Sequence, residues 1–146
     1  MEEYGHDENG IPRLVIPSIR AYPFVKEVFV QLKTKSPEEV YFFMDEGCLT
    51  HPFALSKLLK KLNLDFERQT WGDENTLPEG DNYLLIGAGR VSRRKDSEKV
   101  ILVKDKKSVA YSIGPHRDGL VDVAKKYLPQ EFEFRLGNET IKGGFH

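Results

Sequence analysis

The chain has 146 residues, with 22 basic against 23 acidic side chains and a formal net charge of -1. This length corresponds to one domain, which can bury a hydrophobic core without a disulfide or a structural metal. The near-neutral charge excludes a protein that coats nucleic acid through bulk positive charge. A single cysteine cannot form an internal disulfide, so a disulfide-framed secreted scaffold is excluded and a cytoplasmic location is expected.

No membrane association is expected. The first ten residues lack the apolar segment of a signal peptide. The longest apolar run, at 40–44, is much shorter than the roughly 20 residues of a membrane-spanning helix.

Several segments carry strand or helix patterns. Short, mainly apolar segments predict strands at 14–16, 40–44, 64–68 and 83–86. The segments 100–103 and 109–113 resemble the two strands of a hairpin, and strict alternation at 131–136 predicts an edge strand. Helical spacing of apolar residues predicts helices at 25–32, 55–62 and 114–127. In the first of these, Val28, Val30 and Leu32 also alternate as they would in a strand.

Strands and helices in this order predict one three-layer α/β domain over residues 13–137. Its sheet is expected to be mixed, mainly parallel and Rossmann-like. The acidic residues 1–12 and the residues 138–146 are predicted to be flexible tails.

Polar side chains and glycines gather after the predicted strands. In open α/β sheets, ligands bind beyond the carboxyl ends of the strands, so these segments would meet if the strands are parallel. The candidate ligand-binding residues are Ser18, Arg20, Gly87, Gly89, Arg90, Arg93 and Arg117, and the candidate catalytic residues are His116, Asp45 and Cys48. Turns favour glycine, aspartate and serine for backbone reasons alone, which explains part of this enrichment in any α/β domain.

Two catalytic candidates follow the second predicted strand. Asp45 and Glu46 could hold a divalent cation, but adjacent side chains on a strand point to opposite faces. No second acidic cluster has metal-ligand spacing, so a metal site is not favoured.

Cys48 precedes a helix whose dipole would lower a thiol pKa, and His51 or His116 could act as its base. The alternative for a lone cysteine is a small buried hydrophobe.

The stretch 87–95 resembles the start of a dinucleotide-binding domain, because Gly87 and Gly89 supply the first two glycines after a strand. Ser92 occupies the third small position, and no acid follows convincingly about 20 residues later. The local charge is more informative, since residues 90–107 carry eight basic and three acidic side chains. Glycine N–H groups and bidentate arginines favour anion binding here, and the alternative is a solvated basic loop.

The segment 114–118 opens a predicted helix whose free N–H groups suit an anion. His116 and Arg117 would add donors, and His116 could serve as a general acid or base. In the simpler alternative, Asp118 caps the helix and His116 is exposed.

These observations predict a domain that binds a phosphate-bearing small molecule, first of all a nucleotide, at the carboxyl edge of its sheet. If a reaction follows binding, it would be that of a hydrolase or transferase, with His116 and Asp45 as the catalytic candidates. No cofactor is identified. The alternatives are a nucleic-acid-binding module that uses residues 90–107 and a non-catalytic interaction subunit that pairs through the 131–136 strand.

Overall fold

The structure is a computed structural model and describes residues 1–21, 26–47, 49–64 and 79–146. Its strands are β1 (Glu2–His6), β2 (Pro12–Ile16), β3 (Glu27–Lys35), β4 (Glu38–Met44), β5 (Glu79–Gly80), β6 (Tyr83–Arg93), β7 (Val100–Val103), β8 (Glu133–Leu136) and β9 (Glu139–Lys142). Its helices are α1 (His51–Lys61), α2 (Arg117–Tyr127) and the short 3-10 turn η1 (Lys95–Ser97). Within these ranges no helix is long and apolar enough to cross a bilayer.

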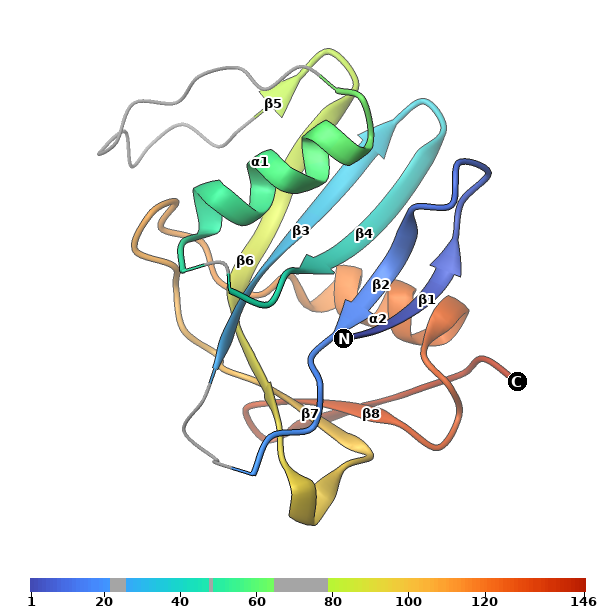
Figure 1. The fold of residues 1–146 in the computed structure, drawn as a ribbon, viewed down its shortest axis with the longest axis vertical. Helices are drawn as coiled ribbons and strands as arrows, with labels where there is room; N and C mark the ends of the chain where they lie inside the picture. The colour runs from blue at the N-terminus through green and yellow to red at the C-terminus, as the bar shows by residue number, and fades with distance from the viewer. Residues whose placement is uncertain (22–25, 48, 65–78) are drawn as a thin grey trace.

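The strands form one sheet in the order β1-β2-β4-β3-β6-β7-β8-β9, with β5 paired to β6. Only the β2–β4 and β7–β8 pairs are parallel among the described strands. The sheet curls into a half-barrel, with β7 and β8 crossing the lower part of the molecule below β3 and β4 (Figure 1).

The predicted Rossmann-like, three-layer α/β architecture is therefore wrong. The described part of the chain is dominated by its sheet, and only 20% of it is helical. A parallel pair needs a long crossover between its strands, whereas antiparallel strands can follow one another through a tight turn. Here β3 and β4 are joined directly as an antiparallel pair, and among the described elements only α2 supplies a helical crossover, between β7 and β8.

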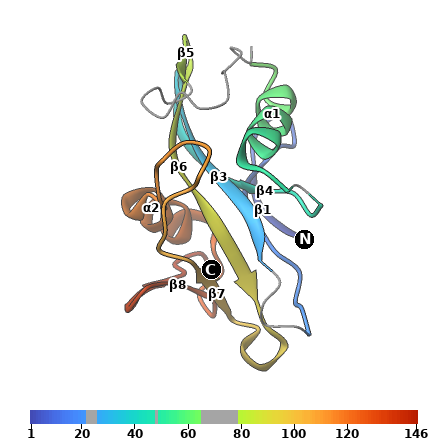
Figure 2. The ribbon, with the colours of Figure 1, turned by 90° about the vertical axis from the view of Figure 1, so that its left-hand side faces the viewer.

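The two α-helices lie on opposite faces of the sheet (Figure 2). The apolar stripe of α1, with Leu55 and Leu58 fully buried, packs against β3 and β4. The stripe of α2, with Leu120 and Val123 fully buried, packs against β2, β4 and β9. These two helices confirm the helices predicted at 55–62 and 114–127.

The helix predicted at 25–32 is wrong, since β3 begins at Glu27. All residues from 27 to 32 are buried, so apolar side chains occur on both faces of this strand. A strand covered on both faces has no clean alternation, and part of its apolar pattern then matches helical spacing.

Three further expectations need correction. Residues 109–113 form a turn in place of a strand, closed by a hydrogen bond from Ser112 N to Ser108 O at 2.9 Å. The 131–136 strand is not an edge, because β8 lies between β7 and β9, and the partner-pairing alternative loses its basis. The ranges predicted as tails contain β1 and β9. The strand predicted at 64–68 lies almost wholly outside the described residues.

Candidate anion-binding site

The predicted phosphate-binding loop is the middle of strand β6. Gly87 pairs with Gln31 of β3, and Gly89 pairs with Phe29. A Cβ atom on Gly87 would lie 2.2 Å from Gln31 Oε1, and one on Gly89 would lie 2.9 Å from the Phe29 ring. Both glycines therefore leave room for neighbouring side chains inside the fold. The dinucleotide interpretation of this motif is wrong, and the nucleotide and hydrolase assignments lose their support with it.

Because the sheet is mainly antiparallel, its strand ends do not meet at one edge, and the predicted site residues fall into separate groups. Ser18 and Arg20 lie near the ends of β2 and β4, which run parallel. The Ser18 backbone N donates to Glu46 Oε1 at 3.4 Å. Arg20 pairs with Glu27 at 3.1 Å and with Glu46 at 3.4 Å. These groups balance one another's charge and stabilise the fold.

Arg93 also has a structural role. Its side chain is only 3% exposed and forms an ion pair with Glu2. Its Nε donates to the Glu98 carbonyl at 2.6 Å, and its guanidinium lies over the Phe132 ring. Burial lowers the pKa of Arg93, with the charge of Glu98 acting in the opposite direction. These partners leave Arg93 inside the protein, away from a ligand.

His116 caps the N-terminus of α2, where its Nδ1 accepts a hydrogen bond from Gly119 N at 2.9 Å. Its backbone joins the sheet through Gln31, whose Nε2 donates to His116 O at 3.0 Å. In return, His116 N donates to Gln31 Oε1 at 2.7 Å. Arg117 is exposed and pairs with Glu139 at 2.6 Å. His116 is exposed, as in the simpler alternative, but the residue that caps the helix is His116 and not Asp118.

Asp45 forms an ion pair with Lys57 of α1. Neither Asp45 nor His116 lines the cavity described below, so the predicted catalytic pair does not meet there. Cys48 lies outside the described residues.

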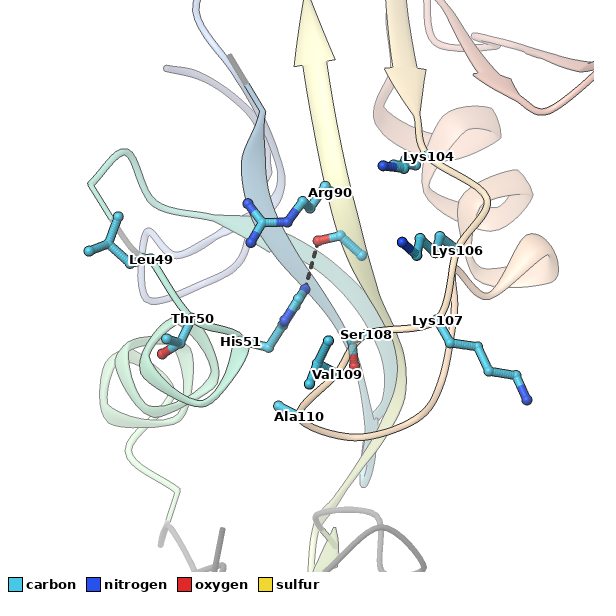
Figure 3. A pocket seen from close by; sticks show the side chains of 11 residues that line it. Leu49, Thr50, His51, Arg90, Lys104, Lys106, Lys107, Ser108, Val109 and Ala110 are labelled. Atoms are coloured by element: carbon cyan, nitrogen blue, oxygen red, sulfur yellow. Dashed lines mark hydrogen bonds between the residues drawn. The ribbon is translucent and has the colours of Figure 1, made fainter. Parts of the chain in front are cut away.

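A cavity of about 300 Å³ opens between the N-terminus of α1 and the segment that follows β7 (Figure 3). The described residues that line it are Leu49, Thr50, His51, Gly89, Arg90, Lys104, Lys106, Lys107, Ser108, Val109 and Ala110. Of the predicted ligand-binding residues, it brings together Gly89 and Arg90.

The wall formed by residues 104–110 is fixed to β6 on both sides. Lys104 N donates to Arg90 O at 3.0 Å, and Ala88 N donates to Gly114 O at 3.2 Å. Between these anchors, the buried Ser108 closes the turn, with its Oγ accepting from Tyr111 N at 3.2 Å. This turn, which the strand prediction for 109–113 missed, places Lys104 and Lys106 across from Arg90, while the Lys107 side chain extends away from the cavity (Figure 3).

The cavity is strongly basic. Arg90, Lys104, Lys106 and Lys107 line it, and its described lining contains no aspartate or glutamate. None of the four cations forms an ion pair within the part of the chain that the structure describes. The Arg90 side chain reaches from β6 toward α1, with Lys104 and Lys106 on the other side (Figure 3). Unpaired like charges around one hollow create a positive potential that concentrates anions.

The first turn of α1 adds to this potential. Thr50 is the N-cap residue but makes no side-chain capping hydrogen bond, and the first turn contains no acid. The positive end of the helix dipole is therefore not neutralised by its own side chains.

His51 forms a polar part of the same wall and is only 7% exposed. Its Nε2 lies 2.9 Å from Gly89 O, and since a carbonyl oxygen only accepts, Nε2 carries the hydrogen. Burial lowers the pKa of His51, the hydrogen bond to Gly89 opposes this shift, and the charge of Arg90 adds to it. His51 is thus neutral near pH 7, and its Nδ1 is an acceptor.

Of the lining residues, Gly89 and Arg90 were predicted to bind a ligand and His51 to act as a base, whereas Lys104, Lys106 and Lys107 were predicted only as part of the basic segment 90–107. The charge of the 90–107 segment was the signal that could have found these lysines. No comparable signal marks the apolar lining, because Leu49 stands outside any apolar run and Val109 begins a run whose pattern predicted a strand.

No protein-family model matches this chain, and no curated protein is detectably similar to it in sequence.

Proposed function

We propose that the protein binds a small molecule that carries a phosphate group and an apolar part, in the cavity between α1 and residues 104–110. The observation that carries this proposal is the set of four cations, without an ion pair among the described residues, that line one hollow. Arg90 offers the planar guanidinium that holds phosphate with two hydrogen bonds, and the lysines add point charges.

The apolar part of the ligand is inferred from the rim of the cavity. Leu49 is 82% exposed and Val109 is 93% exposed, and both line the cavity, one on each wall. Ligand pockets commonly combine apolar walls with a few polar groups that fix orientation. An apolar group attached to the phosphate would cover these side chains.

The proposal is one of binding, and it includes no reaction. His116 and Asp45, which a hydrolase or transferase mechanism would have used, lie outside this cavity. His51 is the remaining titratable group in the wall with an acceptor atom, and its hydrogen bond to Gly89 holds the ring in place.

Calorimetry and thermal melting with phenyl phosphate, inorganic phosphate and phenol test the proposal. We expect phenyl phosphate to bind most tightly, because it alone satisfies both the cations and the apolar rim. At 100 times its Kd, a ligand stabilises the folded state by about 2.7 kcal/mol, which raises the Tm of a chain of this size by about 5–10 °C.

Two variants locate the site. Arg90→Ala and the double change Lys106→Ala with Lys107→Ala should each weaken phenyl phosphate binding by about 10-fold, since each removes charge-assisted contacts. The matched control replaces Lys60 and Lys61, which are exposed at the end of α1 and outside the cavity. No binding by any phosphate probe, or equal losses in the control, would refute the proposal.

Nucleic acid is the second candidate, because Arg94 and Arg135 continue the basic surface beyond the cavity along β6 and β8. It predicts binding that weakens steeply as salt rises, which filter binding with a single-stranded oligonucleotide would measure. Binding that is absent, or insensitive to salt, would rule this candidate out.

A further inference from the structure

A second hollow of about 420 Å³ adjoins the cavity and shares two of its residues, Arg90 and Lys104. It lies over the part of the sheet formed by β6, β7 and β8. Side chains two residues apart on a strand share a face, so Arg90, Ser92 and Arg94 point to the same side of β6. All three line the second hollow.

This second hollow is basic as well. Lys26, Arg94 and Arg135 line it in addition to the two shared cations, and Asp105 is its one acid among the described lining residues. Arg135 is already paired with Glu133 at 3.3 Å. Lys26 and Arg94 form no ion pair within the described residues.

Among the residues of this hollow, Arg94 gives the strongest indication of a bound anion. Its side chain is partly buried, and its Nε is buried without a hydrogen-bond partner among the described residues. A guanidinium that is partly withdrawn from water and has no counter-charge is costly, and an anion beside it offsets that cost.

We propose that the ligand carries at least two phosphate groups, one in the cavity and one beside Arg94, with Arg90 and Lys104 between them. This inference rests on the proposed function and specifies its ligand class as a small polyphosphate or bisphosphate. The backbone hydrogen bond from Lys104 N to Arg90 O, at 3.0 Å, holds the two shared residues together at the junction of the hollows.

A small polyphosphate fits these hollows better than a single-stranded nucleic acid does. Proteins that bind single strands combine a basic groove with aromatic side chains on which the bases stack. The described lining of both hollows contains no phenylalanine, tyrosine or tryptophan.

Calorimetry with inorganic phosphate, phenyl phosphate, tripolyphosphate and a six-nucleotide single strand tests the inference. We expect tripolyphosphate to bind about 10-fold more tightly than inorganic phosphate, since it places charge in both hollows. Arg94→Ala should weaken tripolyphosphate binding by about 5- to 10-fold and leave phenyl phosphate binding within about 2-fold.

Lys95→Ala is the matched control, because Lys95 is exposed, adjacent in sequence and outside both hollows. Lys26→Ala changes an exposed side chain of the second hollow and should show the same selective loss if Arg94→Ala does not fold.

Equal affinity for inorganic phosphate and tripolyphosphate would overturn the inference, and so would equal effects of Arg94→Ala and Lys95→Ala. Tighter binding of the oligonucleotide than of tripolyphosphate would overturn it in favour of nucleic acid. In each of these cases phenyl phosphate binding that depends on Arg90 would leave the proposed function standing, whereas its absence would remove both.

Discussion

Replacing Gln31 with leucine should destabilise the protein, because Gln31 links β3 to the start of α2. Gln31 is fully buried and makes two hydrogen bonds to the backbone of His116, at 3.0 and 2.7 Å. Leucine has a similar volume, so the change removes the hydrogen bonds without opening a large cavity.

The expected cost follows from these two bonds. Each contributes about 0.5–1.5 kcal/mol, and the His116 N–H and C=O groups lose their partner as well. The His116 side chain is exposed, so water can reach part of this region and limit the penalty. We therefore expect the free energy of unfolding to fall by about 2–3 kcal/mol, and the Tm to fall by about 4–12 °C.

Urea unfolding followed by circular dichroism measures this change. Gln130→Leu is the control, because Gln130 is exposed and a surface substitution of this kind changes stability by less than about 0.5 kcal/mol. If Gln31→Leu is as stable as Gln130→Leu, the hydrogen-bonded link between β3 and the start of α2 is incorrect.

Gly89→Ala should cost about 1–3 kcal/mol in the same urea assay, because its Cβ would lie 2.9 Å from the fully buried Phe29 ring, and an unchanged midpoint would contradict that contact. Arg93→Met should lower the free energy of unfolding by about 1–3 kcal/mol, because it removes the ion pair with Glu2 and the hydrogen bond to the Glu98 carbonyl. A variant as stable as the unchanged protein would show that these two interactions contribute nothing. The lowered pKa of His51 means that the unfolded chain takes up a proton below about pH 6.5 while the folded chain resists it. The free energy of unfolding should therefore fall from pH 6.5 to 5, and His51→Gln should have a flatter profile over that window; an identical slope would refute this origin.

Local structure was predictable where a segment has one buried face or a short apolar run. The strands at 14–16, 40–44, 83–86 and 100–103 and both α-helices follow from such patterns. The pattern was ambiguous in β3, where Phe29 and Val30 point to opposite faces and are both fully buried. It was misleading at Gly87 and Gly89, because glycine marks both a loop and a place in a strand where neighbours come close.

The candidate site depended on strand order, which is a long-range property. Ser18 and His116 would approach Arg90 only at one edge of a parallel sheet, and this sheet is mainly antiparallel. Arg93 lies on β6 three residues from Arg90, so its side chain points to the opposite face of the strand. Arg90 alone among the predicted cations lines the cavity, because the turn at Ser108 brings residues 104–110 back beside it. The basic character of the segment 90–107 was visible in the sequence. The position of α1 on the other side of the cavity was not.

The position of the bound phosphate is the central claim, and an NMR titration of the labelled protein with phenyl phosphate tests it most directly. We predict that the largest changes in amide shifts fall on residues 49–51, 89–90 and 104–110, which line the cavity. Changes centred on residues 114–119 at the start of α2, or no saturable changes at all, would contradict it.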